Sequence, residues 1–228
     1  MKWNLPKDIK FTVDAYYKDF DNLVEFLEGD STNVINAINY ESKATQGTGT
    51  SRGIEFGLIK TGEQFSGSIN YTYSKTDRQF DEINGGEVFP YRFDLRHVAS
   101  AGFVYAFNKK WTANATWIYS SGINLTLPTR KYGVPSPFPN VAPISIPILS
   151  ARNGVRLPAN HRLDVGMNYK VKKRGLTHNF QFGIYNVYNS LNPIFFRLRR
   201  NPANTSELQF VSVSLLPITP SFNYSIEF

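Results

Sequence analysis

Two short clusters in the sequence combine a carboxylate, a guanidinium and an imidazole, the groups from which acid–base and ion-binding sites are built. They are Asp94, Arg96 and His97, and His161, Arg162 and Asp164. In an extended strand, residues two apart share a face and adjacent residues lie on opposite faces. Each Asp is therefore predicted to lie beside its Arg, with the His on the other face. This arrangement favours ion pairs, with contact to a substrate or to another domain as a further option, and it gives acid–base catalysis the least support.

The other residue types offer little for catalysis or metal binding. The chain has no cysteine, which excludes thiolate nucleophiles, thiolate metal sites and disulfides. No two of its three histidines stand at ligand spacing. Gly47, Gly49, Gly53 and Gly57 loosely resemble a phosphate-binding loop, but neither a helix pattern nor a suitable lysine follows. We expect these glycines to mark a bulge or a close approach in a strand, and we expect no catalytic residue, no metal and no cofactor.

The elements that carry the clusters are predicted to be strands, and residues 110–121 show the pattern well. The odd positions from Trp111 to Tyr119 are apolar or aromatic, and the even positions are polar except for Ile118. This period of two indicates a strand with one apolar and one polar face. From Trp111 to Tyr119 it would span roughly 27 Å, or roughly 20 Å in height at the ~40° tilt of a membrane barrel. That height nearly matches the apolar band of an outer-membrane barrel.

The same alternation recurs along the chain and predicts eight strands. They cover residues 8–18, 54–58, 64–75, 92–107, 111–119, 160–172, 179–198 and 206–228. Short turns at 61–63, 108–110 and 173–176 alternate with long loops at 20–46, 80–91, 127–158 and 200–205, the first of which carries a short piece of strand at 23–26. In outer-membrane barrels short turns face the periplasm and long loops face outside. A turn at Pro217 would end the chain outside, so we predict a bend at 217–220. Asn186 and Asn189 interrupt an apolar face, where a bulge would restore the alternation.

The loop at 127–158 differs from the others because it holds seven of the 13 prolines. Proline cannot donate to a ladder, so we predict no strand pair there. The loop is also too apolar for a disordered linker, and loops of this length are usually functional. Tyr132, Phe138 and Asn140 are candidate ligand contacts within it.

Composition narrows the class of protein further. The 228 residues contain no apolar run long enough for a helical membrane span, whereas a membrane barrel needs only weak alternation. The net charge of +7 comes from scattered cations and short clusters, not from a stripe, which argues against a nucleic-acid partner. Residues 1–30 show no secretory signal, and for an exported protein we expect that the N-terminal part is missing.

Several segments resemble a known family. They are FPYRFDLRH (89–97), WIYSSGINLTLP (117–128), NHRLDVGMNYKVKK (160–173), FGIYNVYNSLNP (182–193) and the terminal PSFNYSIEF. Over roughly residues 45–228 they resemble the C-terminal barrel of TonB-dependent outer-membrane receptors, of the type with a carboxypeptidase-like domain ahead of the plug. The resemblance implies an all-β fold, an antiparallel transmembrane β-barrel segment with about eight of the ~22 strands of such a barrel. The plug domain is expected to be absent from residues 1–228.

This resemblance implies a place and a set of partners. The chain is expected in the bacterial outer membrane, as the C-terminal barrel part of a receptor for energy-coupled uptake of a nutrient ligand. Expected partners are outer-membrane lipid, the remaining barrel and plug, the TonB complex and the ligand, with a surface lipoprotein as one option. The acidic and basic residues Asp94, Arg96, Arg162 and Asp164 are expected to form a lumenal charge ladder. Residues expected in the aromatic membrane girdle are Trp111, Trp117, Tyr119, Tyr169, Phe222, Tyr224 and Phe228.

Two other functions fit the pattern of alternating strands. One is a complete eight-stranded outer-membrane adhesin or structural protein that uses the loop at 127–158. The other is a soluble carbohydrate-binding β protein whose apolar faces pack against each other. The inward residues of two strands favour a wide lumen, because eight strands closed on themselves leave room only for side chains that fill the interior. Rows of Ser, Thr and Asn would fill such an interior poorly.

Overall fold

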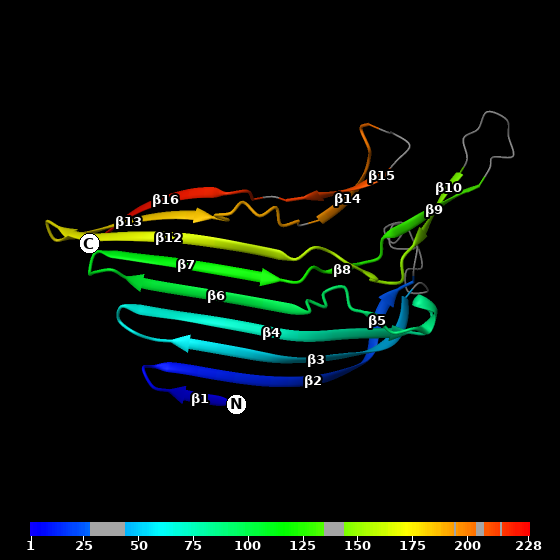
Figure 1. Cartoon of the computed structure of the whole chain (residues 1–228), viewed down its shortest axis with the longest axis horizontal. Coiled ribbons are helices and arrows are strands. Elements are labelled where there is room, and N and C mark those ends of the chain that lie inside the picture. The colour runs from blue at the N-terminus through cyan, green and yellow to red at the C-terminus, as the bar shows by residue number, and fades with distance from the viewer. Residues whose placement is uncertain (28–43, 135–143, 194, 204–207, 215) are drawn as a thin grey trace.

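The computed structural model describes residues 1–27, 44–134, 144–193, 195–203, 208–214 and 216–228. Their main body is a single antiparallel sheet in the order β1-β2-β3-β4-β6-β7-β12-β13-β16 (Figure 1). Its strands are β1 (Lys2–Leu5), β2 (Ile9–Phe26), β3 (Ala44–Lys60), β4 (Phe65–Phe80), β6 (His97–Ala106), β7 (Trp111–Ser120), β12 (Asn160–Lys173), β13 (Leu176–Tyr185) and β16 (Thr219–Glu227). The two-residue β5 (Phe89–Pro90) pairs with β4 beside this path. The predicted all-β antiparallel fold is confirmed.

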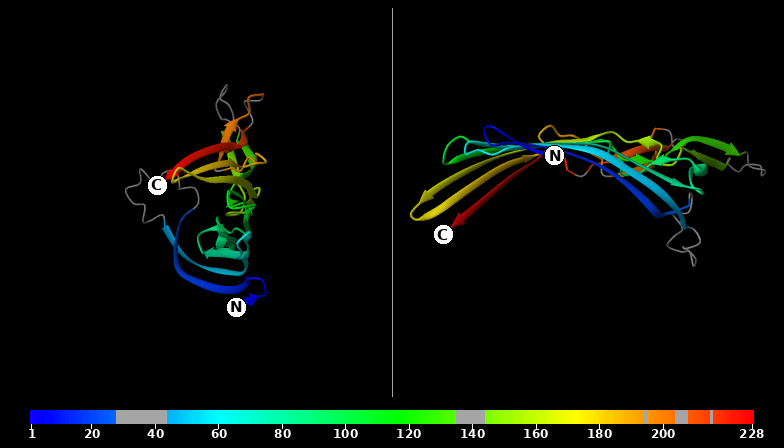
Figure 2. Two further views of the ribbon diagram at one scale, coloured as in Figure 1. Left: turned by 90° about the vertical axis from the view of Figure 1, so that its left-hand side faces the viewer. Right: turned by 90° about the horizontal axis from the view of Figure 1, so that it is seen from below.

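Apart from the short β1 and β5, the sheet consists of eight strands of nine to eighteen residues. This number agrees with the eight predicted strands. The sheet curves into an arc when it is seen end-on (Figure 2). It is open, because β1 and β16 lie at opposite ends of the strand order. The structure therefore corresponds to a segment of a barrel wall and not to a closed eight-stranded barrel.

Short turns gather at one end of the sheet and long connections at the other (Figure 1). We call these the short-turn end and the long-loop end. At the short-turn end, β12 and β13 are joined by Arg174 and Gly175, both with positive φ, as a two-residue hairpin of the type I′ family requires. Asn108 supports the β6–β7 turn by accepting hydrogen bonds from the backbone N–H groups of Lys110 and Trp111. The three predicted short turns are confirmed.

The long-loop end carries three small ladders that the sequence pattern did not indicate. They are β8 (Asn124–Leu125) with β11 (Val155–Arg156), β9 (Pro128–Val134) with β10 (Ile144–Leu149), and β14 (Phe195–Arg200) with β15 (Leu208–Val213). The prediction of no strand pair at 127–158 was wrong. A two-stranded ladder consists only of edge strands, so a proline can stand where its nitrogen faces away from the partner. Pro128 begins β9, and Pro147 lies opposite Lys131.

Strand boundaries also differ from the predicted ones at the long-loop end. The strand predicted to begin at residue 92 begins at His97, because residues 91–96 form a turn in which the Asp94 N–H donates to the Tyr91 carbonyl. Each of the last two predicted strands divides into a sheet strand and a strand of the β14–β15 ladder. β2 and β3 reach further than predicted, and a register shift between Phe20 and Leu23 interrupts their pairing. The piece of strand predicted at 23–26 belongs to β2.

Little of the chain forms a closed core. The buried hydrophobic side chains of the described residues are Phe80, Ile83 and Phe89, with Leu23 and Leu27 packed against them. This cluster lies at the long-loop end, around the 3-10 turn Asn84–Gly86. Elsewhere both faces of the sheet are open, so the side-chain chemistry of each face can be followed strand by strand.

Candidate functional site: two faces and two polar clusters

Strand register gathers aromatic side chains into a row on one face of the sheet. Trp111 lies opposite Tyr169, Tyr169 opposite Phe180 and Phe180 opposite Tyr224. Their ring centroids are 4.5, 6.0 and 4.8 Å apart along this order, within the range of favourable aromatic pairs. We call these four residues the aromatic row, and the face that carries them the apolar face. The row crosses β7, β12, β13 and β16 near the short-turn end.

The other residues expected in a membrane girdle lie at different heights on the chain. Trp117 and Tyr119 stand nearer the long-loop end of β7, with ring centroids 6.1 Å apart. Phe222 lies opposite Phe182, one step from the aromatic row toward the middle of the sheet. Phe228 follows β16 and is fully exposed.

The opposite face, which we call the polar face, carries small hydrophilic side chains. Beside the aromatic row, register places Thr112 opposite Asn168, Asn168 opposite Gln181 and Gln181 opposite Asn223. A shallow hollow of about 620 Å³ on this side of the sheet includes the following polar residues: Ser66, Ser68, Thr112, Asn114, Thr116 and Asn168. These side chains offer many hydrogen-bond groups and little bulk.

One of the two predicted clusters forms around the buried carboxylate of Asp94 at the long-loop end. One of its oxygens accepts from the Thr76 backbone N–H at 2.8 Å, and the other accepts from Arg96 at 2.9 Å and Arg156 at 2.8 Å. Arg156 also donates to the Asp94 carbonyl at 2.6 Å and the Gly122 carbonyl at 2.9 Å. The carboxylate thus joins β4, the turn before β6, and β11. Since its oxygens are already engaged with donors, it is poorly suited to accept a proton from a substrate.

Arg96 remains charged in this cluster. Burial disfavours its charged form, but the hydrogen bond to Asp94 and the charge of Asp94 outweigh that cost and raise the pKa of the guanidinium. Arg156 was missed by sequence reasoning, because it lies 62 residues from Asp94 in a loop without a clear pattern.

The second predicted cluster is built in a similar way on β12. Arg162 donates to Asp164 at 2.9 Å and to the Tyr185 hydroxyl at 2.5 Å, and its guanidinium lies 4.2 Å from the Tyr185 ring centroid. The second Asp164 oxygen accepts from the Asn186 backbone N–H at 2.9 Å. Both Asp–Arg ion pairs are therefore present as predicted. Among the described residues no ion pair joins the two clusters. The lumenal charge ladder expected of these four residues stays a prediction.

The histidines point away from both carboxylates and each contacts a tyrosine. His97 is 2.8 Å from the Tyr71 hydroxyl, His161 is 3.1 Å from that of Tyr188, and His178 is 2.7 Å from that of Tyr224. Within the described ranges, no three His, Cys, Asp or Glu side chains come close enough to hold a metal ion. Among the hydrogen bonds and ion pairs of the described residues, none joins a histidine to an aspartate, the pairing that acid–base catalysis often uses.

Asn186 has a structural role. In the sequence it was visible only as a polar residue that interrupts an alternating apolar face. Its side chain is buried, donates to the carbonyls of Ser190 and Leu216, and accepts from the Ser190 N–H. Asn186 and Asn189 both have positive φ, and the Asn189 N–H donates to the Asn186 carbonyl. The predicted bulge is wrong: β13 ends at Tyr185, and a turn follows.

The candidate ligand loop is described only in part. Tyr132 lies in β9 with 63% of its surface exposed. Phe138 and Asn140 lie outside the described residues. The predicted close approach at the glycines of β3 is seen at Gly53, where an added Cβ would stand 2.8 Å from the Tyr16 ring.

Comparison with known proteins adds an independent finding. The family model described as "TonB dependent receptor-like, beta-barrel" matches residues 1–187, a range that begins earlier and ends earlier than the resemblance in the sequence. No curated protein matches the chain. Among the described residues, no helix is long and apolar enough to cross a membrane. The match covers most of the chain and agrees with its open antiparallel sheet, so the chain belongs to the TonB-dependent receptor-like β-barrel family.

Proposed function

We propose that this chain forms the C-terminal part of the barrel wall of an outer-membrane receptor that takes up a nutrient ligand with energy supplied through TonB. Its family consists of outer-membrane receptors that transport ligands. The observation that carries the proposal is the separation of a largely apolar face from a largely polar face across the crossing strands. A bilayer outside and a wet interior inside require this separation.

The apolar face is the lipid face in this proposal. The aromatic row lies at the periplasmic interface, and Trp117 and Tyr119 lie toward the external one, since Trp and Tyr favour membrane interfaces. Short turns then face the periplasm and the long-loop end faces outside. The polar face lines the lumen, and the Asp94 and Arg162–Asp164 clusters brace the wall where it meets the external loops.

The small polar side chains support a lumen wider than eight strands enclose. A closed eight-stranded barrel is just wide enough for its interior to be filled by side chains. The polar face instead presents Ser, Thr, Asn and Gly across neighbouring strands. In addition, β16 pairs on one side only within the described residues, and an exposed edge of this kind calls for a further strand. Both features fit a sector of a larger barrel better than a free-standing adhesin.

Uptake in cells that produce the chain in its natural context tests the proposed function. A panel of labelled oligosaccharides and peptides would be offered with and without a protonophore. We expect that one class enters in an energy-dependent way, and that removal of the β9–β10 hairpin reduces its binding at the cell surface. Uptake that continues unchanged with the protonophore would indicate a passive pore and would contradict the proposal.

A further inference from the structure

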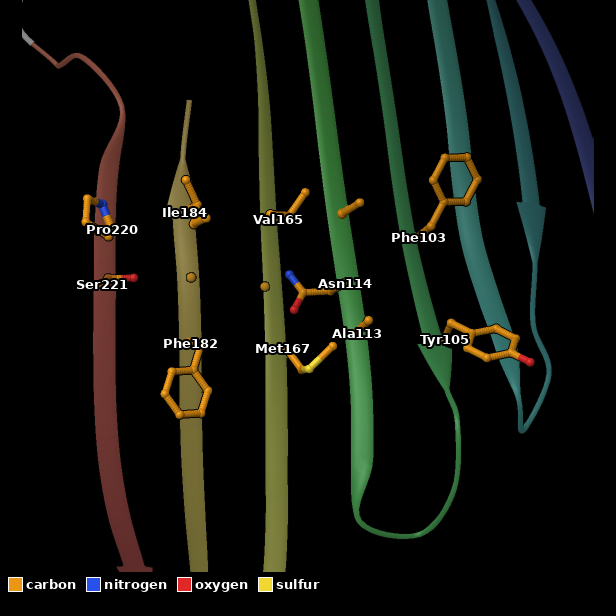
Figure 3. Close-up of a pocket in the computed structure, with 13 residues that line it drawn as sticks. Phe103, Tyr105, Ala113, Asn114, Val165, Met167, Phe182, Ile184, Pro220 and Ser221 are labelled. Carbon is orange, nitrogen blue, oxygen red and sulfur yellow. The ribbon is translucent and has the colours of Figure 1, made fainter. Parts of the chain in front are cut away.

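The apolar face contains a groove of about 640 Å³ that runs across β7, β12 and β13 (Figure 3). Small residues form its floor, namely Ala113, Ala115, Gly166 and Gly183. Phe103 and Tyr105 of β6 stand on one side, and Phe182 of β13 stands on the other (Figure 3). The groove results from sequence, because β7 carries only Ala113 and Ala115 at this height of the apolar face. Phe103 and Tyr105 of β6 lie on one side of these alanines, and Val165 and Met167 of β12 lie on the other.

The chemistry of the groove favours a hydrocarbon chain as its occupant. None of its lining residues is charged, and nearly all of its surface is apolar. β7 and β12, which lie under the groove, are paired with neighbouring strands on both sides, so their backbone N–H and C=O groups are engaged and not available to a peptide. A peptide lying there in hydrocarbon would keep its own polar groups unsatisfied, which costs several kcal/mol for each group. An acyl chain has no such groups.

Cations stand at the short-turn end of the same strands. Lys109 and Lys110 lie in the β6–β7 turn, and Lys173 and Arg174 lie in the β12–β13 turn, all of them exposed. Within the described part of the chain, no carboxylate pairs with these four side chains. Glu227 on β16 pairs instead with Lys170 at 3.3 Å. The mouth of the groove therefore carries uncompensated positive charge.

The spacing between the groove and these cations fits a membrane lipid. From Ala113 to Lys110 the strand covers roughly 10 Å, or roughly 8 Å in height at ~40° tilt. From Met167 to Lys173 it covers roughly 20 Å, or roughly 16 Å in height. Half of a barrel's apolar band is about 12 Å, so the two turns bracket the depth at which a phosphate lies when its acyl chain reaches the groove.

We propose that this groove and the two basic turns form a binding site for an anionic phospholipid of the periplasmic leaflet. One acyl chain lies over Ala113, Ala115 and Gly166, and the phosphate lies between the β6–β7 and β12–β13 turns. The site rests on the assignment of the apolar face to lipid. It goes beyond uptake, because it gives this sector of the wall a defined lipid neighbour.

Tryptophan quenching by brominated lipids tests the site directly. Trp111 and Trp117 flank the groove on β7, and Trp3→Phe removes the third tryptophan, which lies on β1. The full chain would be refolded into vesicles of phosphatidylcholine that contain increasing fractions of brominated phosphatidylglycerol, and into vesicles in which only the zwitterionic lipid is brominated. Stronger quenching by the anionic lipid at equal mole fraction gives its relative affinity.

We expect a preference for phosphatidylglycerol of about five-fold for each cation that reaches the phosphate. The double change Lys109→Gln and Lys110→Gln should lower this preference. Lys7→Gln, in the β1–β2 turn of the same end, combined with Lys2→Gln on β1, should not lower it. Ala115→Leu should reduce quenching by filling the groove. Ala15→Leu adds the same volume to the apolar face on β2, away from the groove and from both reporter tryptophans, and should leave quenching unchanged.

Four outcomes would overturn the proposal. Equal quenching by both lipids would show a membrane protein without this site. An unchanged preference for phosphatidylglycerol in the Lys109 and Lys110 variant would show that these cations do not bind the phosphate of the lipid in the groove. No quenching by either lipid would contradict the assignment of the apolar face to the membrane. Cross-linking that shows a second copy of the chain covering the groove would make the occupant a protein and not a lipid.

Discussion

An arginine at position 115 should destabilise the chain far more than an arginine at position 114. Ala115 lies on the apolar face, opposite Phe103 and Val165, and four residues from both Trp111 and Tyr119. It is therefore near the middle of the proposed membrane band. Arginine at the midplane of a barrel's lipid face costs about 2–4 kcal/mol, which lowers the folding equilibrium constant by about 30- to 900-fold.

Asn114→Arg is the matched control on the adjacent residue. Asn114 belongs to the polar face, between Thr112 and Thr116, where a long charged side chain can extend into water. We expect a cost within about 0.5 kcal/mol, as for other exposed substitutions. Urea unfolding of both variants in vesicles, with heat-dependent gel mobility as the readout of the folded fraction, would measure the difference in their free energies of unfolding. Equal costs at the two positions would refute the assignment of the faces.

Three further predictions concern packing and polar contacts. Asp94→Asn leaves Arg96 and Arg156 without a counter-charge and should lower the free energy of unfolding by about 2–3 kcal/mol. This is below the full value for a buried ion pair, because both guanidiniums are partly exposed. Chemical denaturation would measure the change, and an unchanged free energy of unfolding would argue against a stabilising role of the cluster. Gly53→Val should cost about 1–3 kcal/mol by overpacking against Tyr16, whereas Gly133→Ala, with open space around it, should cost less; thermal unfolding of the pair would show whether the two differ. Asn186→Ala should lower the free energy of unfolding by about 1–3 kcal/mol, because it leaves buried backbone groups without hydrogen-bond partners. It should also increase hydrogen exchange at residues 186–190. Unchanged exchange there would contradict the role of Asn186 in holding this turn.

Period-two alternation was sufficient to predict the sheet, because an extended strand turns successive side chains to opposite faces. The strand from Trp111 to Ser120 was predicted almost to its last residue, and so was β12. By the same parity on β12, Arg162 and Asp164 share one face and His161 lies on the other. Local sequence contains this information, since a shift of one residue would reverse both faces at once.

Contacts between distant loops could not be predicted in this way. Arg156 reaches Asp94 from another loop, and Asn186 reaches Leu216 across 30 residues. Neither partner shows any periodic signal. The β9–β10 ladder was missed for a different reason: its prolines argue against a central strand, but they are compatible with a ladder made only of edges.

Single-cysteine scanning along β7 tests the central claim most directly, because the chain has no cysteine of its own. Each position from 111 to 120 would be replaced in turn, and the refolded protein in vesicles would be exposed to a water-soluble maleimide that does not cross lipid. We predict strong labelling at positions 112, 114 and 116 and protection at 113, 115 and 117. Uniform labelling, or protection of the even positions, would contradict a membrane-spanning wall with its apolar face in lipid.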